Sequence, residues 1–331
     1  RTADLEALST AALALNGGTI TDATGNAAAT GLPALGSAGS LGGAKDLVID
    51  GVGPTIGNVT STNPDGAYKA GDTIRIEVTL SEAVVIAGGT PTLLLETGGT
   101  DHAATFVSGS GTATLVFEYV VQPGDATGDL DYAGSGAIAL NGATATDPAG
   151  NPADLSLPAP GAPGSLGANK GIALDTGAPA VVAVSSTTPD GNYNAGSTIT
   201  LTVQFDEAVT VTGAPTLQLE TGATDRLATY AGGSGSDTLT FTYTVQPGDA
   251  TPDLESLATN ALALGDGTIA DAAGNAAALA LPALGSAGSL GGSKDIVIDG
   301  GTPQVTGVSA TNPDGTYQAG AVISVTVTFS D

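Results

Sequence analysis

Cysteine, methionine and tryptophan are all missing from this sequence of 331 residues. Without cysteine, the protein can form neither disulfides nor thiolate metal sites. Basic residues are also scarce: 7 Lys and Arg stand against 33 Asp and Glu, which gives a formal net charge of −26. So negative a charge argues against binding nucleic acid or an anionic membrane. It suits divalent cations wherever several carboxylates converge.

The sequence also lacks an apolar run of about 18 residues, so it predicts no transmembrane helix and no membrane insertion. Its first residues show no basic stretch followed by an apolar core, and any export signal is therefore expected outside this sequence. Glycine is abundant, with 50 residues, and high glycine with low charge can accompany disorder. The regular alternation of apolar and polar residues argues for a folded protein instead.

One motif occurs three times along the chain. It reads NPDGAYKAGD from Asn63, TPDGNYNAGS from Thr188 and NPDGTYQAGA from Asn312, which gives steps of 125 and 124 residues. The stretches VQPGDAT, GSLG and Asp-x-x-Gly-Asn recur with the same steps. A period of this length is that of a whole domain rather than of a solenoid repeat.

Proline residues at 54, 179 and 303 mark the boundaries between these repeats. They predict complete repeats at 54–178 and 179–302, with the C-terminal part of a repeat at 1–53 and the N-terminal part of another at 303–331. The sequence is therefore interpreted as a stretch of a longer tandem array.

Each repeat predicts an all-β fold. The stretch IRIEVTL from Ile74 alternates apolar and polar residues, and so do its copies ITLTVQF from Ile199 and ISVTVTF from Ile323. A period of two with one apolar face is typical of a half-buried strand. Clusters of Gly, Pro, Asn and Asp separate these runs, as turns require. We expect antiparallel β-sandwiches of about seven to nine strands. The stretch ADLEAL from Ala3 could instead form one helical turn, and that alternative stays open.

These motifs, with TPTLLLETG from Thr90 and SGSGTATLVFEYVVQPGD from Ser108, resemble the tandem immunoglobulin-like repeats of giant bacterial surface proteins. The nearest type is the swimming-motility repeat, which is similar to repeats in many large secreted adhesins. The resemblance covers the whole chain. It implies immunoglobulin-like sandwiches arranged as an elongated rod, outside the cell at a bacterial surface. The related calcium-binding adhesin arrays imply Ca²⁺ ions that stiffen the junctions between repeats.

Acidic residues expected at each junction are candidate calcium ligands. In an immunoglobulin-like unit the second strand returns towards the preceding linker, which places Glu82 near Asp50, and the next-to-last strand returns there too. Oxygen donors from separate loops suit Ca²⁺ better than Mg²⁺, which keeps more of its waters. The candidate ligands are Asp50, Glu82, Asp147 and Asn151; Asp175, Glu207, Asp271 and Asn275; Asp299 and Asp331; and Asp22 and Asn26 in the first segment.

Each candidate also has a structural alternative. An Asp-x-x-Gly-Asn stretch makes a good turn without metal, because Asp accepts local backbone hydrogen bonds and Gly tolerates a left-handed conformation. Three acidic groups brought together without a counter-ion would repel one another, which favours an ion between them. Asp65, Asp72 and Asp125 are expected at the opposite end of the unit and are weaker metal candidates.

Catalysis finds little support in the sequence. The single histidine, His102, corresponds to Arg226 in the next repeat, and arginine cannot serve as a general base because it stays protonated. His102 is therefore expected to be a surface strand residue. Ser108 and Ser110 lie in a hairpin-like turn with no base nearby in the sequence. We expect the protein not to be an enzyme.

The repetition of one domain favours a structural function, in which each added repeat makes the molecule longer. The hypothesis is a calcium-stiffened segment of a large extracellular surface protein, as an adhesin stalk, a surface-layer component or a filament. Its expected partners are neighbouring repeats of the same chain, with copies of itself in a filament or layer as a further candidate. The alternative is an immunoglobulin-like module that binds surface glycans through loops such as the one at Leu95. Aromatic residues amount to only 4%, which leaves little for an aromatic binding platform.

Overall fold

The computed structural model of this chain describes residues 4–330. The chain divides into two compact units, Arg1–Asp175 and Thr176–Asp331. Nearly all regular structure in the described residues is β, because the helices there are three single turns. The prediction of an all-β fold with antiparallel sheets is confirmed. The helical turns are α1 (Leu41–Ala44), α2 (Leu166–Asn169) and α3 (Leu290–Ser293).

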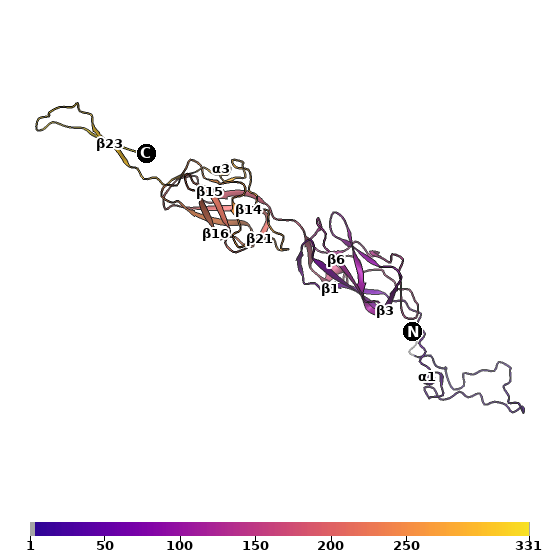
Figure 1. Ribbon diagram of the computed structural model, residues 1–331. Helices are drawn as coiled ribbons and strands as arrows, with labels where there is room; N and C mark the ends of the chain where they lie inside the picture. The colour runs from indigo at the N-terminus through magenta and orange to yellow at the C-terminus, as the bar shows by residue number, and fades with distance from the viewer. Residues whose placement is uncertain (1–3, 331) are drawn as a thin grey trace. The chain divides into compact units, whose positions relative to one another are not determined.

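The first unit contains a sandwich of two sheets. In its described part, one eight-stranded sheet has the order β1-β3-β6-β5-β4-β8, with β9 beside β4 and β10 beside β3. The other sheet has the order β2-β11-β7. Figure 1 shows β1, β3 and β6 lying next to one another in this unit. The strands are β1 (Ile56–Ser61), β2 (Gly66–Tyr68), β3 (Thr73–Ala87), β4 (Thr92–Glu96), β5 (His102–Ser108), β6 (Thr112–Val120), β7 (Ala126–Thr127), β8 (Asp131–Tyr132), β9 (Ile138–Ala139), β10 (Thr144–Thr146) and β11 (Ile172–Asp175).

Alternation along β3 and β6 decides which side chains form the core of the first unit. Ile74, Ile76 and Val78 are fully buried, whereas the residues between them face outwards. The antiparallel register places Ile76 opposite Phe117 and Val78 opposite Leu115. Successive residues of a strand point to opposite faces, so these four side chains enter the same core. The predicted strand and its predicted buried face are therefore both present.

β3 continues beyond the strand that the sequence predicts and changes its partner part-way. Its first half pairs with β1 and β6, and its last residues, Val85–Ala87, pair with β10. Ser110, in the turn between β5 and β6, supports this second half. Its hydroxyl accepts a hydrogen bond from the Ile86 N–H at 2.9 Å and donates one to the Ile86 carbonyl at 3.2 Å. Glu82 was expected at the end of a strand and instead lies within β3, where the pairing changes.

One strand pair in each unit is parallel, which the alternation did not predict. In the first unit β2 pairs with β11, with Gly66 opposite Ile172. Parallel strands need a long connection, and these two come from near the beginning and from the end of the first sandwich. An ion pair lies at the same place, since Lys170 Nζ is 3.0 Å from Asp65 Oδ1. The parallel pair therefore joins the two ends of the sandwich.

The second unit repeats this arrangement. Its eight-stranded sheet has the order β12-β14-β17-β16-β15-β19, with β20 beside β15 and β21 beside β14, and its small sheet has the order β13-β22-β18. Leu201 lies opposite Phe241, as Ile76 lies opposite Phe117. The strands are β12 (Val181–Ser186), β13 (Gly191–Asn194), β14 (Thr198–Thr212), β15 (Thr216–Glu220), β16 (Arg226–Gly232), β17 (Ser236–Thr244), β18 (Ala250–Thr251), β19 (Glu255–Ser256), β20 (Leu262–Ala263), β21 (Thr268–Ala270), β22 (Ile296–Asp299), β23 (Val305–Ala310) and β24 (Val325–Phe329).

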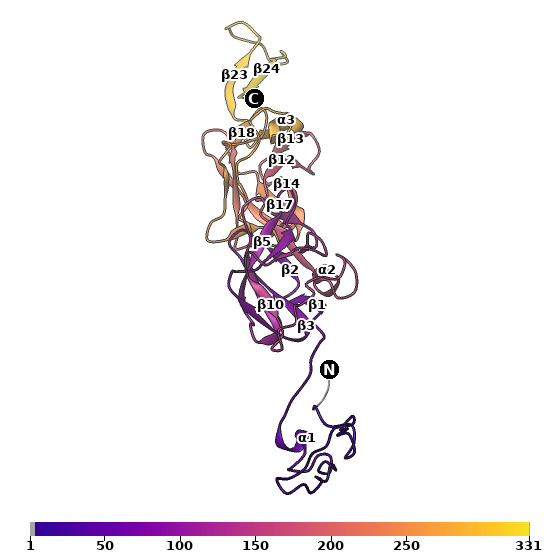
Figure 2. The same ribbon diagram turned by 90° about the vertical axis from the view of Figure 1, so that its right-hand side faces the viewer.

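Each complete sandwich also carries one helical turn against its first strand. α2 lies against β1 in the first unit, and α3 lies against β12 in the second (Figure 2). A serine caps each turn: the hydroxyl of Ser165 accepts a hydrogen bond from the Ala168 N–H, and that of Ser289 accepts one from the Gly292 N–H. The recurring GSLG stretch therefore encodes a capped helical turn. One leucine of each turn is buried, Leu166 or Leu290.

Residues 4–53 contain α1 and little strand pairing, since Thr21 and Ala27 form an isolated bridge. Residues 4–8 form no helix, although one helical turn had remained an alternative there; Ala3 lies outside the described residues. The Leu5 N–H instead donates a hydrogen bond to the Leu47 carbonyl at 2.7 Å. The same bond joins Leu130 to Ile172 in the first sandwich.

The third copy of the predicted strand begins at Val325 rather than at Ile323. It is β24, which pairs with β23 in an antiparallel register that places Val308 opposite Val327. Among the described residues no further strand joins this pair. Phe329 is consequently 52% exposed, whereas Phe205 at the same position of the second unit is buried.

Candidate metal centre

Three acidic side chains of the first unit converge on one place. Asp50 precedes β1, Glu82 lies within β3, and Asp147 directly follows β10. One carboxylate oxygen of each lies within 4.8 Å of the other two. Asp147 is buried, with 2% of its surface exposed, and Asp50 and Glu82 are half-buried. The structure therefore brings together three of the predicted ligands, from three separate segments.

The turn that follows β10 fixes the orientation of Asp147. Asn151 donates two hydrogen bonds of 2.8 Å to it, from its backbone N–H to Oδ1 and from its side-chain nitrogen to Oδ2. Gly150 adopts a φ of 94°, a left-handed conformation that favours glycine. Hydrogen bonds to the ionised form, above all the one from the Asn151 side chain, hold the pKa of Asp147 below its usual range.

Asn151 acts here as a hydrogen-bond donor. Its side-chain nitrogen also donates to the Asp50 backbone carbonyl at 3.0 Å. The residue thus ties the segment before β1 to the turn after β10. An amide nitrogen cannot bind a cation, so only the side-chain oxygen of Asn151 is available as the predicted ligand.

An open hollow of about 370 Å³ adjoins two of the three acidic residues, Asp50 and Glu82. Its lining includes Asp50, Glu82, Ala83, Pro148 and Ala149. The space exceeds what a bare ion needs and leaves room for several waters, which commonly complete the oxygen shell of Ca²⁺. All three acidic groups offer hard oxygen donors, and neither Cys nor His belongs to the group. The donor set and the room beside it fit a calcium ion.

The second unit repeats two of these three positions. A carboxylate oxygen of Glu207 lies within 4.8 Å of one of Asp271. Asn275 holds Asp271 as Asn151 holds Asp147, with hydrogen bonds of 2.8 Å from its backbone and 2.7 Å from its side chain. Asp175, the counterpart of Asp50, is the last residue of the first unit and ends β11.

The remaining predicted ligands are not gathered in the same way. Asp22 accepts hydrogen bonds from Asn26 and Thr24, so the same turn recurs in the first segment. Neither Asp22 nor Asp299 belongs to a group of three such side chains within residues 4–330. Asp299 accepts a hydrogen bond from the Gly301 N–H at 3.1 Å. Asp331 lies outside the described residues.

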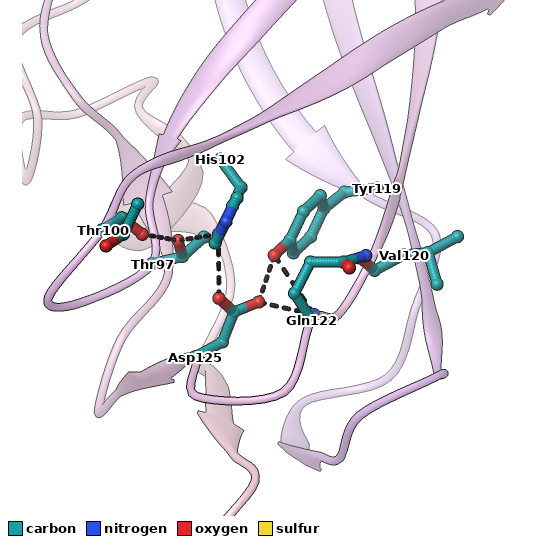
Figure 3. A network of polar contacts seen from close by, with 7 residues as sticks. All are labelled: Thr97, Thr100, His102, Tyr119, Val120, Gln122 and Asp125. Atoms are coloured by element: carbon teal, nitrogen blue, oxygen red, sulfur yellow. Dashed lines mark hydrogen bonds and ion pairs between the residues drawn. The ribbon is translucent and has the colours of Figure 1, made fainter.

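A second polar centre of the first unit was not predicted from the sequence (Figure 3). His102 begins β5, as expected of a strand residue, but its side chain points at the buried carboxylate of Asp125. Nδ1 of His102 lies 3.0 Å from Asp125 Oδ1 and 3.1 Å from the Thr97 hydroxyl. That hydroxyl donates to the Thr100 carbonyl, so it accepts the hydrogen bond from Nδ1, which must carry a proton.

Asp125 has further donors on its other oxygen. The Tyr119 hydroxyl donates to Oδ2, and so does the Gln122 N–H at 2.8 Å. Burial first, and then the hydrogen bond to Asp125, raises the pKa of Tyr119 to about 12. The aspartate, which is 1% exposed, thereby connects the start of β5 with the end of β6 and the β6–β7 loop. Asp125 serves here as a buried acceptor.

The second unit builds the same centre around an arginine. Arg226 Nε donates to Asp249 Oδ1 at 2.9 Å, and the Tyr243 hydroxyl and Gln246 N–H donate to Oδ2 at 2.6 and 2.9 Å. Burial alone would raise the pKa of Asp249, but hydrogen bonds from Tyr243, Gln246 and Arg226 lower it. The signal in the sequence was the spacing: the Tyr and the Asp recur after 124 residues, and Arg226 follows His102 at the same interval.

None of the helices in the described residues is long and apolar enough to cross a membrane. No protein-family model matches the chain. A search of curated proteins found no similar sequence. The resemblance to tandem immunoglobulin-like repeats therefore rests on the repeated motifs themselves and stays a prediction.

Proposed function

We propose that this chain is a structural segment of a large extracellular bacterial surface protein, in which bound Ca²⁺ stabilises immunoglobulin-like repeats. Such a segment would serve as an adhesin stalk, a surface-layer component or part of a filament. The observation that carries the proposal is the meeting of Asp50, Glu82 and Asp147 in the first unit. The residue types recur one repeat later, at Asp175, Glu207 and Asp271.

The energetics favour an ion among these carboxylates. Three negative groups within 4.8 Å of one another repel strongly in a partly buried place. The hydrogen bonds from Asn151 keep Asp147 ionised, so protonation of that group does not relieve the repulsion. A bound divalent cation would supply positive charge and Lewis-acid character there. Asp50, Glu82 and Asp147 would hold it, and Asn151 would keep Asp147 in position.

Thermal unfolding of the full chain tests the calcium proposal. A ligand that binds only the folded state adds about 2.7 kcal/mol at a hundredfold excess over its Kd. We therefore expect a melting temperature higher by roughly 5–10 °C in millimolar Ca²⁺ than in chelator. Glu82→Gln, which removes one charge and keeps the shape, should abolish most of this shift for the first unit.

Glu77→Gln is the matched control, because Glu77 lies on the same strand and outside the acidic group. It should keep the full calcium shift. Equal melting temperatures in Ca²⁺ and chelator for the unmodified chain would rule the calcium proposal out. A shift that Mg²⁺ reproduces would show a less selective ion site than the one proposed.

We further propose that the repeats follow one another as an elongated rod. The support is the length of the period, which makes each repeat a domain, and the proline residues at the boundaries, which restrict the backbone. Small-angle scattering of the full chain in Ca²⁺ should give a maximum dimension well above that of a compact protein of 31.6 kDa. A compact scattering profile would contradict the rod and leave the calcium result unaffected.

A further inference from the structure

Threonine residues form a row across the outer face of the second sandwich. The registers place Thr216 opposite Thr229, Thr229 opposite Thr242, and Thr242 opposite Thr200, so one threonine comes from each of β15, β16, β17 and β14. Neighbouring strands lie about 4.8 Å apart, and the hydroxyls therefore follow one another at short, regular intervals. Thr229 is exposed and the other three are half-buried. Figure 1 labels β14, β15 and β16 in this unit.

A hollow of about 270 Å³ opens beside this row. Arg226, Thr229, Thr242, Thr244 and Gln246 contribute to its lining. Leu227 also lies there and is 55% exposed, which adds a small apolar surface. The hollow thus combines hydroxyl groups, one amide, one guanidinium and one apolar side chain.

A buried carboxylate holds the guanidinium group of Arg226 in place beside the hollow. Its Nε donates to the buried Asp249, and within residues 4–330 its two terminal nitrogens have no hydrogen-bond partner. Gln246 uses its side-chain nitrogen to donate to the Thr244 carbonyl at 2.9 Å, which leaves its side-chain oxygen as an acceptor beside the hollow. The hollow therefore has fixed donors from Arg226 and an acceptor from Gln246. Both lie next to threonine hydroxyls, which can donate or accept a hydrogen bond.

The first unit has a hollow at the same place, with a different chemical character. Its lining includes His102, Thr105, Glu118 and Gln122, at the positions of Arg226, Thr229, Thr242 and Gln246. Glu118 pairs with Arg75 at 2.7 Å, so this face carries charges of both signs. In the second unit Thr242 and Thr200 occupy the corresponding positions. The two repeats therefore share a frame and differ in what their outer faces can bind.

We propose that the hollow of the second unit, with its threonine row, binds a neutral, hydroxyl-rich glycan chain. Sugar hydroxyls donate and accept, which matches the mixture of Arg226, threonine and Gln246 groups. Leu227 offers an apolar contact for the C–H face of a sugar ring. An acidic glycan fits less well, because Asp249 already balances the charge of Arg226 and the chain carries a net charge of −26.

A matched pair of variants of the full chain tests this proposal. The probes are a printed array of neutral and acidic glycans, followed by biolayer interferometry with soluble dextran, galactomannan and β-glucan. Thr229→Glu places an unpaired charge at the hollow and should weaken binding to the neutral glycan roughly tenfold. Thr105→Glu adds the same charge at the equivalent position of the first unit and should leave binding unchanged.

Both threonines are exposed, so neither substitution disturbs a core, and equal melting temperatures would verify folding. The proposal is overturned if no neutral glycan binds. It is also overturned if acidic glycans bind more tightly, or if both variants lose binding equally. If the protein is retained on growing ice and binds no glycan, the threonine row binds ice instead. That result would likewise overturn the glycan proposal.

Discussion

Asp125 and Asp249 are each 1% exposed, and each accepts hydrogen bonds from one side-chain nitrogen and two further donors. His102 and Arg226 supply that side-chain nitrogen at the same position of the two repeats. Histidine in one repeat and arginine in the other can fill the same position if the shared task is to donate a hydrogen bond to a buried carboxylate. That shared task explains why the position is polar in both units.

Removing this acceptor should destabilise the second unit. Asp249→Ala leaves Arg226 Nε, the Tyr243 hydroxyl and the Gln246 N–H without their acceptor. Because Tyr243 is buried and Arg226 is one-third exposed, we expect a loss of about 2–4 kcal/mol in the free energy of unfolding. Urea unfolding followed by circular dichroism measures it. Asp237→Ala, at an exposed position, should change stability by less than about 0.5 kcal/mol, and a similar value for Asp249→Ala would contradict the prediction.

Asn151 should control the protonation of Asp147. Asn151→Ala removes the side-chain hydrogen bond and keeps the one from the backbone, so the pKa of Asp147 should rise towards its usual value. NMR titration of carboxyl carbons in chelator measures this directly. Asn275→Ala, the same change in the second unit, should leave the pKa of Asp147 where it was.

The sign of the accompanying pH dependence follows from the direction of the shift. A carboxyl group whose pKa is lower in the folded than in the unfolded state adds stability above its unfolded pKa. That contribution is lost as the pH falls through the folded pKa. The stability difference between the unmodified chain and Asn151→Ala should therefore be largest near neutral pH and smaller in acid. A difference that grows as the pH falls would contradict this account.

The sequence allowed part of the candidate site to be predicted. The expected directions of the strands decide which loops meet, and they predicted that Asp50, Glu82 and Asp147 would lie together. The donor role of Asn151 could not be predicted, since residue type alone does not tell which end of an amide faces a carboxylate. The centre at Asp125 was missed because its members come from β5, β6 and the loops beside them, and alternation within one strand does not show which side chains of different segments meet.

At the scale of elements, the turn between β5 and β6 depends on one glycine. Gly109 has a φ of 105°, and a Cβ there would lie 2.0 Å from the Thr114 carbonyl oxygen. Gly109→Ala should cost about 2–4 kcal/mol, because both the backbone conformation and the contact disfavour a side chain. Gly111→Ala is the control: its φ is 84°, but nothing lies within 4 Å of the added Cβ, so about 1 kcal/mol is expected. Equal losses in thermal unfolding would show that the close contact is unimportant.

Strong alternation made the long strands predictable, and its absence hid the short ones. β6, β17 and the first halves of β3 and β14 each have one continuous apolar face, and all were expected. β7 to β9 are two residues long, which is too short to show any period. The parallel pairing of β2 with β11 depends on contacts between residues about 100 positions apart, and no local pattern carries that information.

At the scale of the whole molecule, each unit has a hydrophobic core of its own. The core of the first unit is built from residues between Val59 and Leu174, and that of the second from residues between Val184 and Ile298. Phe117 and Phe241 occupy the same position in the two cores, and both are fully buried. Two separate cores imply that the units gain their stability separately.

Core substitutions should therefore affect one unit at a time. Phe117→Ala removes a fully buried ring and should cost the first unit about 3–5 kcal/mol. In calorimetry of the full chain in chelator, one transition should move down by roughly 10 °C or more while the other stays in place. Phe241→Ala should move the other transition instead. If the unmodified chain shows a single peak, each variant should split it in two, because only the altered unit melts earlier. A single transition that shifts as a whole in both variants would mean that the two units unfold as one cooperative body.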